Sequence, residues 1–305
     1  NGAYEKSLKC LQKVLSIKPN YAEALINRGL INLAKDAKLD ALTDFEKAHQ
    51  LKPHIKEIWN PLVKLKIEFE ELPGAIALSK AMIKIDPNNE KILINLAKCY
   101  QITEEYDEAI LAYERIISLN PRSASAWNNL GTIIQLQGKL EHALKYYKKA
   151  LFIDPYYADA YYNIGLAILK QGKLIEAIDT FRKALSINSN LPEAHMNIGQ
   201  ALENQKKPTA AIEAYEQAIS LKPNFPEAYN SKGNALQSQN RLDEAIENYK
   251  KALSFKPDYV EAYNNMGNVL ADQGKLLASI DTFKKAIKIN PCYSSAWNNI
   301  FFPLS

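Results

Sequence analysis

The feature that most constrains this chain is a proline that returns at a fixed interval. The series is Pro19, Pro53, Pro87, Pro121, Pro155, Pro223, Pro257 and Pro291. Every gap is 34 residues except one of 68, where Ser189 takes the missing place, so the pattern needs no insertion or deletion. A period of this length indicates that one small structural unit is stacked many times, each copy packing on its neighbours.

The proline also sets the repeat boundaries, if it is given position 32 of each unit. Eight full repeats follow: 22–55, 56–89, 90–123, 124–157, 158–191, 192–225, 226–259 and 260–293. Residues 1–21 then form the second helix of a truncated repeat, and residues 294–305 form the start of a ninth repeat or the lead-in to a downstream domain. We therefore expect the chain to be a segment of a longer protein.

Each repeat reads as two helices, A at about positions 1–14 and B at about positions 18–31. In repeat 158–191, Tyr161, Ile164 and Ile168 recur at helical spacing in helix A. Position 8 is usually Gly, position 20 Ala and position 24 aromatic. We expect the small residues at positions 8 and 20 to let the helices approach, the ring at position 24 to fill the gap, and the proline to end helix B. The sequence predicts an all-α solenoid with a concave groove lined by A helices.

One repeat carries a complete known signature. It reads Trp127-x-x-Leu130-Gly131, then Ala143, Tyr147, Ala150 and Pro155. This pattern resembles the tetratricopeptide repeat (TPR), and the resemblance covers residues 1–299. It implies a right-handed superhelix of helix-turn-helix units that binds protein or peptide partners and is not itself an enzyme. Repeat 56–89 departs most, with Val63 at position 8, Ser79 at position 24 and Pro61 inside helix A, where we expect a lost hydrogen bond and a softened joint.

Polar amides mark the expected groove. At 100° per residue, positions 2, 5, 6, 9, 12 and 13 of helix A lie opposite the core positions. The residues predicted to line a peptide-binding groove are Asn27, Asn95, Asn128, Asn129, Thr132, Gln135, Asn163, Asn197, Gln200, Asn230, Asn234, Gln237, Asn264, Asn265, Asn268 and Asn299. An Asn amide both donates and accepts hydrogen bonds, as a peptide backbone does. The row resembles the asparagine ladder in the TPR arm of O-linked N-acetylglucosamine transferases, although duplication of one ancestral repeat would also produce it.

Other binding and catalytic sites have little support. A carboxylate clamp for chaperone tails needs Lys or Arg at positions 2, 5 and 6, and Lys91 is a lone exception to Glu, Asn and Ser there. The net charge of +4 and the predominance of Lys disfavour nucleic acid. No apolar run suits a membrane span. The three Cys and four His show no metal-ligand spacing, so we expect no metal and no cofactor. A cytoplasmic location is the default, and the oligomeric state is not predicted.

Two functions remain open at this point. The first is a scaffold that holds an extended partner segment in its groove. The second is the substrate-recruiting arm of a larger glycosyltransferase, sulfotransferase or methyltransferase, with its catalytic domain beyond residue 305. The second is favoured by the final residues, where Phe301 replaces the expected Gly and Pro303 breaks the helix. We expect something to cover the Phe301–Phe302 pair, because exposed apolar patches usually mark an interface.

Overall fold

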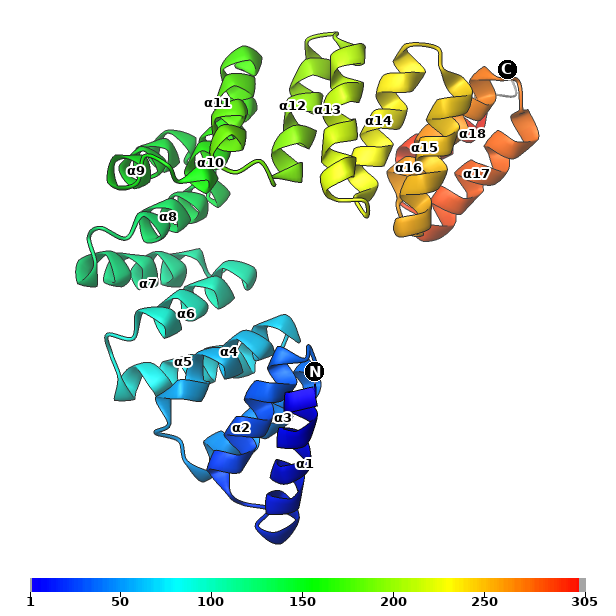
Figure 1. Cartoon of the computed structure of the whole chain (residues 1–305). Coiled ribbons are helices and arrows are strands. Elements are labelled where there is room, and N and C mark those ends of the chain that lie inside the picture. The colour runs from blue at the N-terminus through cyan, green and yellow to red at the C-terminus, as the bar shows by residue number, and fades with distance from the viewer. Residues whose placement is uncertain (1, 302–305) are drawn as a thin grey trace. The chain divides into compact units, whose positions relative to one another are not determined.

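The computed structural model describes residues 2–301 and is entirely helical over that range (Figure 1). The chain divides into two compact units, the first ending at Ile153 and the second beginning at Asp154. The all-α solenoid of stacked helix pairs predicted from the period is confirmed. Odd-numbered helices after α1 are the B helices of the repeats, and even-numbered helices are the A helices.

The helix bounds follow the 34-residue register. The first unit contains α1 (Gly2–Ile17), α2 (Ala22–Ala34), α3 (Lys38–Leu51), η1 (Lys56–Ile58), α4 (Trp59–Glu68), α5 (Leu72–Ile85), α6 (Glu90–Ile102), α7 (Tyr106–Leu119), α8 (Ala124–Leu136) and α9 (Leu140–Ile153). The second contains α10 (Ala158–Lys170), α11 (Leu174–Ile187), α12 (Pro192–Asn204), α13 (Pro208–Leu221), α14 (Pro226–Ser238), α15 (Leu242–Phe255), α16 (Val260–Asp272), α17 (Leu276–Ile289) and α18 (Ser294–Phe301). The sequence break expected at Phe302 and Pro303 lies outside the described residues.

The turn between A and B has the same backbone in every full repeat. Position 15 is left-handed throughout, with φ between 59° and 80° at Asp36, Glu70, Glu104, Gly138, Gly172, Lys206, Asn240 and Gly274. An L residue resists this conformation, and glycine does not. At the other end, helix B stops before the proline: Lys52 has φ −141° and ψ 80°, the extended backbone favoured in front of Pro53.

The close approach of helices A and B depends on glycine at position 8. A Cβ built on Gly165 would lie 2.6 Å from Cε1 of Phe181, the fully buried ring at position 24. The other repeats with glycine at position 8 show the same clash with the position 24 ring. The ring at position 24 thus fills the gap between the helices, and it lies so close to the glycine that only a hydrogen there leaves room for it.

In repeat 56–89 the larger side chain is at position 8 and the smaller one at position 24. Val63 and Ser79 stand where the other repeats carry a small residue and a ring, and both are fully buried. The Oγ atom of Ser79 has no hydrogen-bond partner among the described residues.

The expected loss of an interior hydrogen bond at Pro61 is wrong. Residues 56–58 form a short 3₁₀ helix, and α4 begins only at Trp59, so Pro61 lies in its first turn. Amides in the first turn have no acceptor within the helix, so the missing N–H removes no helical bond. The proline therefore delays the start of α4 and does not interrupt it.

Tryptophan at position 4 links consecutive repeats. The indole Nε1 of Trp59 donates to the carbonyl of Pro53 over 2.9 Å, and Trp127 does the same to Pro121 over 3.0 Å. Each bond joins the start of helix A to the proline that closes the preceding repeat. The proline thus ends one helix with its ring and anchors the next with its carbonyl oxygen.

Candidate peptide-binding site

The residues predicted to line the groove, called the amide row from here on, lie on the even-numbered helices but are not equally accessible to solvent. Asn27 and Gln200 are exposed. Those partly exposed are Asn129, Thr132, Gln135, Asn163, Asn197, Asn234, Gln237, Asn265, Asn268 and Asn299. Four are buried, namely Asn95, Asn128, Asn230 and Asn264. The buried amides therefore differ from the expectation of an open groove at these positions.

A repeated hydrogen-bond pattern explains the burial in the second unit. Asn265 Nδ2 donates to Asn230 Oδ1 over 3.2 Å and to Asn234 Oδ1 over 3.0 Å. One repeat later, Asn299 Nδ2 donates to Asn264 Oδ1 over 3.1 Å and to Asn268 Oδ1 over 2.9 Å. The side-chain oxygens at positions 5 and 9 of one A helix thus accept hydrogen bonds from the side-chain nitrogen at position 6 of the next A helix.

This pattern fixes the role of each side chain. An amide nitrogen carries two hydrogens, and both hydrogens of Asn265 and of Asn299 are used. Neither Oδ1 atom accepts a hydrogen bond from any described residue. Asn265 and Asn299 at position 6 therefore offer an acceptor, while Asn230 and Asn264 at position 5 are buried because they join neighbouring A helices.

Two other residues at position 6 also donate to position 5 of the preceding A helix. Asn197 Nδ2 donates to Tyr162 Oη over 3.1 Å and to the Glu193 carbonyl over 2.8 Å. In the first unit, Asn95 Nδ2 donates to Asn60 Oδ1 over 2.9 Å. Asn60 and Asn95 thus form one link of the network across α4 and α6.

Buried tyrosine hydroxyls donate hydrogen bonds to polar side chains on the A helices. At position 24, Tyr147 donates to Gln135 over 3.1 Å, Tyr215 donates to Glu203 over 2.9 Å, and Tyr249 donates to Asn234 over 2.8 Å. Burial raises the pKa of each of these phenols, so the hydroxyl stays protonated and remains a donor.

The sequence indicates these hydrogen bonds through a correlation between positions 24 and 12, which the prediction of groove residues did not consider. Repeats with Tyr at position 24 carry Gln or Glu at position 12, as in Tyr113/Gln101, Tyr147/Gln135, Tyr215/Glu203 and Tyr249/Gln237. Repeats with Phe carry an apolar residue there, as in Phe45/Leu33, Phe181/Leu169 and Phe283/Ala271. A hydroxyl beneath the groove needs an acceptor, and a plain ring does not.

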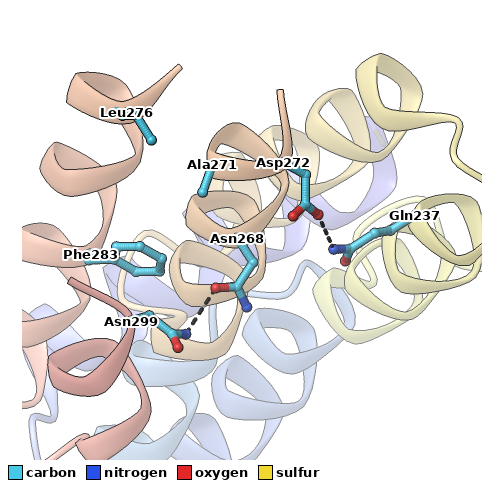
Figure 2. Close-up of a pocket in the computed structure, with 7 residues that line it drawn as sticks. All are labelled: Gln237, Asn268, Ala271, Asp272, Leu276, Phe283 and Asn299. Carbon is cyan, nitrogen blue, oxygen red and sulfur yellow. Dashed lines mark hydrogen bonds between the residues drawn. The ribbon is translucent and has the colours of Figure 1, made fainter. Parts of the chain in front are cut away.

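In repeat 260–293, which has Phe283 at position 24 and Ala271 at position 12, a hollow opens beside the amide row. It measures about 370 Å³ and has Ala271, Leu276 and Phe283 on its apolar side (Figure 2). Asn268 and Asn299 form part of its polar side, hydrogen bonded to each other. On the same side, Gln237 Nε2 donates to Asp272 over 3.1 Å. The hollow could receive one apolar side chain from a chain lying along the row.

The described residues contain no group of three or more His, Cys, Asp or Glu side chains able to hold a metal ion. Burial lowers the pKa of His195 and His49, which fits packed rings better than exposed bases. Among the helices described, none is long and apolar enough to cross a membrane.

Family comparisons agree with the helix-pair geometry. Models of the tetratricopeptide repeat match residues 66–132, 135–172, 168–206, 192–225, 214–247, 233–274 and 260–291. The chain is a tetratricopeptide repeat protein. As a TPR protein it belongs to a class of protein-binding scaffolds whose repeat fold is typically non-catalytic.

Two relatives of higher sequence identity match parts of the chain. A stretch of 94 residues is 35% identical to the protein STIP1 homolog of Dictyostelium discoideum, and spans 29% of this chain but 16% of that protein. The structure of YrrB, a TPR protein with an unusual peptide-binding site, aligns with a TM-score of 0.50 and 28% identity over 61% of this chain and 96% of YrrB.

Two more distant structures show the fold alone. The hetero-tetramer Cut9–Hcn1 of the APC/C aligns with a TM-score of 0.69 and 14% identity over 99% of this chain and 59% of the matched chain. PilF of Pseudomonas aeruginosa aligns with a TM-score of 0.62 and 19% identity over 71% of this chain and 97% of its own.

Proposed function

We propose that this TPR protein holds an extended segment of a partner protein along the even-numbered helices of its second unit, gripping the segment by its main chain. The observation that carries the proposal is the double use of Nδ2 in Asn265 and Asn299, which leaves their Oδ1 atoms as acceptors. An extended segment has backbone N–H groups that need acceptors when water is displaced. Contacts to the main chain depend little on the sequence of the segment.

The hollow beside Phe283 would add a preference for one kind of side chain. Its floor is apolar, while amides line its edge. A Leu, Met or Phe of the segment would bury its side chain against Phe283 and Ala271, at about 1.5–3 kcal/mol for full burial. The similarity to YrrB, whose described feature is a peptide-binding site, supports the same general use of the fold.

The experiment that tests the main-chain grip uses backbone-modified ligands. Fluorescein-labelled unstructured peptides of varied sequence are titrated into the protein, and each is compared with a version N-methylated at alternate residues. N-methylation removes N–H donors and keeps every side chain. We expect broad, weak binding that N-methylation abolishes, and equal binding of both versions would refute the grip.

A paired substitution locates the grip on the protein. Asn265→Ala with Asn299→Ala should weaken binding, and Asn248→Ala on the odd-numbered helix α15 serves as the control. The melting temperature of each variant is measured as well, because the two groove substitutions also remove bonds between repeats. Loss of binding in a variant that still folds supports the proposal. Unchanged binding would leave the amides with a purely structural role.

The substrate-recruiting arm of a larger transferase stays a second hypothesis. Its sequence argument rests largely on residues 302–305, which lie outside the described range. The coding sequence beyond codon 305 tests it directly: a catalytic domain there would favour the arm, and a short polar capping helix would favour the free scaffold.

A further inference from the structure

A second kind of groove lies between successive odd-numbered helices, away from the amide row. Its floor is the A helix between them, at positions 4, 7 and 11, and its wall includes position 23 of the following B helix. Between α5 and α7 this groove is open, with a volume of about 360 Å³ and the apolar floor of Leu93, Leu96 and Tyr100. It belongs entirely to the first unit.

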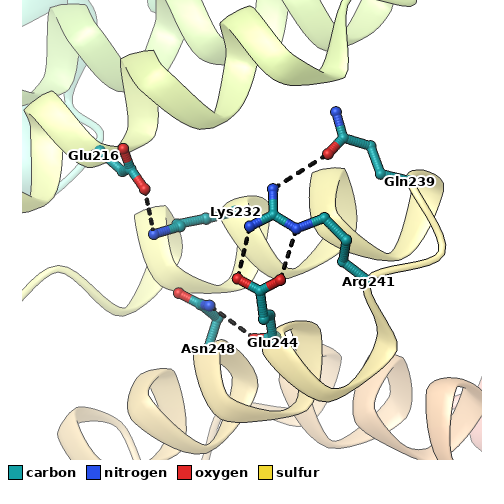
Figure 3. A network of polar contacts seen from close by, with 6 residues as sticks. All are labelled: Glu216, Lys232, Gln239, Arg241, Glu244 and Asn248. Carbon is teal, nitrogen blue, oxygen red and sulfur yellow. Dashed lines mark hydrogen bonds and ion pairs between the residues drawn. The ribbon is translucent and has the colours of Figure 1, made fainter.

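In other described repeats, side chains occupy part of the equivalent space. Tyr146, at position 23, stacks on Trp127 with ring centroids 5.9 Å apart. In repeat 226–259, Lys232 rises from position 7 and pairs with Glu216 over 2.7 Å (Figure 3). Arg28, also at position 7, pairs with the buried Asp44 at position 23 through bonds of 2.9 and 2.6 Å, and both residues line a smaller, polar hollow of about 270 Å³ between α1 and α3. A large or charged residue at these positions therefore either fills the groove or makes its lining polar.

Alanine at position 23 leaves the groove open. Ala112 lines the opening between α5 and α7, and Ala214 lines the equivalent opening of about 450 Å³ between α11 and α13. Both alanines stand where Tyr146 stacks in another repeat. The two openings thus share a small residue at position 23, and they make a natural pair for comparison.

The two grooves differ in charge and in apolar character. The α5–α7 groove is lined by Lys80, Lys84 and Arg115, with Glu108 as the acidic residue in its lining. Lys84 and Arg115 form no ion pair with any described residue, and Lys80 lies over the Tyr100 ring at 5.5 Å. The α11–α13 groove instead has Glu213 and Glu216 on its wall, beside Arg182.

Leu111 gives the strongest indication that the α5–α7 groove is used. It is 59% exposed on the wall of the groove. Position 22 is charged in all later full repeats, as Lys145, Asp179, Glu213, Glu247 and Asp281. An exposed leucine beside unpaired cations, above an apolar floor, has the composition of an interface and not of a solvated helix face.

We propose that the groove formed by α5, α6 and α7 docks a short acidic protein segment that inserts one large apolar side chain between Leu93, Leu96 and Leu111. The segment's carboxylates would pair with Lys84 and Arg115, whose charges have no partner in the described chain. This surface is separate from the amide row, so the protein could hold one segment on its even-numbered helices and another here.

The test uses a short fluorescein-labelled peptide of Asp and Glu with a single central Phe. Two control peptides replace the Phe by Ser, or all the acids by Lys. Binding to the full chain is followed by fluorescence anisotropy, and the site is mapped by amide shifts in nuclear magnetic resonance spectra. We expect the acidic Phe peptide to bind, to weaken as salt is raised, and to shift amides of α5 and α7.

Matched variants decide whether this groove is responsible. Ala112→Tyr, which copies the arrangement at Tyr146, should fill the groove and weaken binding by about tenfold or more, which is about 1.4 kcal/mol. Lys84→Glu with Arg115→Glu should do the same without touching the core, and it covers the case in which Ala112→Tyr fails to fold. Ala214→Tyr in the equivalent groove, and Asn265→Ala with Asn299→Ala in the amide row, should leave the peptide-induced amide shifts of α5 and α7 unchanged.

Three results would overturn the proposal. They are an acidic Phe peptide that shifts no amides of α5 and α7, a Lys peptide that shifts them equally, and shifts that survive both groove variants. Because the amide-row variant is included, failure of this site is distinguishable from failure of the main-chain grip.

Discussion

The size exchange between positions 8 and 24 predicts that two harmful substitutions will rescue each other. Gly165→Val would place a Cβ atom 2.6 Å from the Phe181 ring, which is fully buried and cannot move aside. We expect overpacking to cost about 3 kcal/mol. Phe181→Ser empties the ring's volume and should cost about 3–5 kcal/mol. The double variant recreates the Val63–Ser79 pair of repeat 56–89.

The two costs should therefore not add. Independent effects would sum to about 6–8 kcal/mol, and we expect the double variant to lose about 3 kcal/mol less than that sum, because valine enters the space that the ring vacates. The assay is native-state hydrogen exchange of amides in α10 and α11, since repeat arrays open locally. Gly74→Val is the control, because its nearest neighbour is a flexible Lys66 carbon 3.8 Å away. Additivity within about 0.5 kcal/mol would refute the packing argument.

Three further predictions concern the turns and the buried charges. Lys206→Gly should stabilise the protein by up to about 1 kcal/mol in thermal unfolding, because φ is 59° there and glycine adopts this backbone without strain. The greater entropy of glycine in the unfolded chain offsets only part of this gain. A lower melting temperature would contradict the prediction. Burial raises the pKa of Glu203 above its usual 4.5, so charging it costs stability as pH rises through that range. Glu203→Gln should raise the melting temperature at pH 7 but not at pH 4, and an equal gain at both would count against it. Burial lowers the pKa of His195 below 6.5, so its neutral form stabilises the fold above pH 6.5 and that stability is lost as pH falls below it. His195→Tyr, the residue found at Tyr161, should make melting less sensitive to pH between 7 and 5, and an unchanged slope would argue against this.

Much of the fold could be predicted from the chain because its key contacts are local to one repeat. The proline at position 32, the glycine at position 8 and the ring at position 24 lie within one helix pair, and their spacing alone indicates how they meet. Pro61 was misjudged because the point where α4 begins depends on the preceding 3₁₀ turn. That turn has no equivalent in the other described repeats.

The site was harder to predict because it is made between repeats. A helical wheel places position 5 on the open face, yet Asn230 and Asn264 are buried, since the next A helix covers them. The sequence of a single helix does not indicate which of its residues the next A helix will bury. The groove at Ala112 was missed for a similar reason, because its opening depends on which side chains three helices contribute together.

The spacing of the amide row has a consequence for the shape of anything it holds. Asn265 bonds directly to the helix before it, and helices in contact lie about 8–10 Å apart. A β-strand turns alternate N–H groups to opposite sides, so it would meet successive asparagines out of phase. A polyproline II helix has three residues per turn and rises about 3.1 Å per residue, or about 9.3 Å per turn. Its N–H groups therefore recur on one side at the spacing of the repeats. We expect the segment held here to be a left-handed helix with one turn for each TPR.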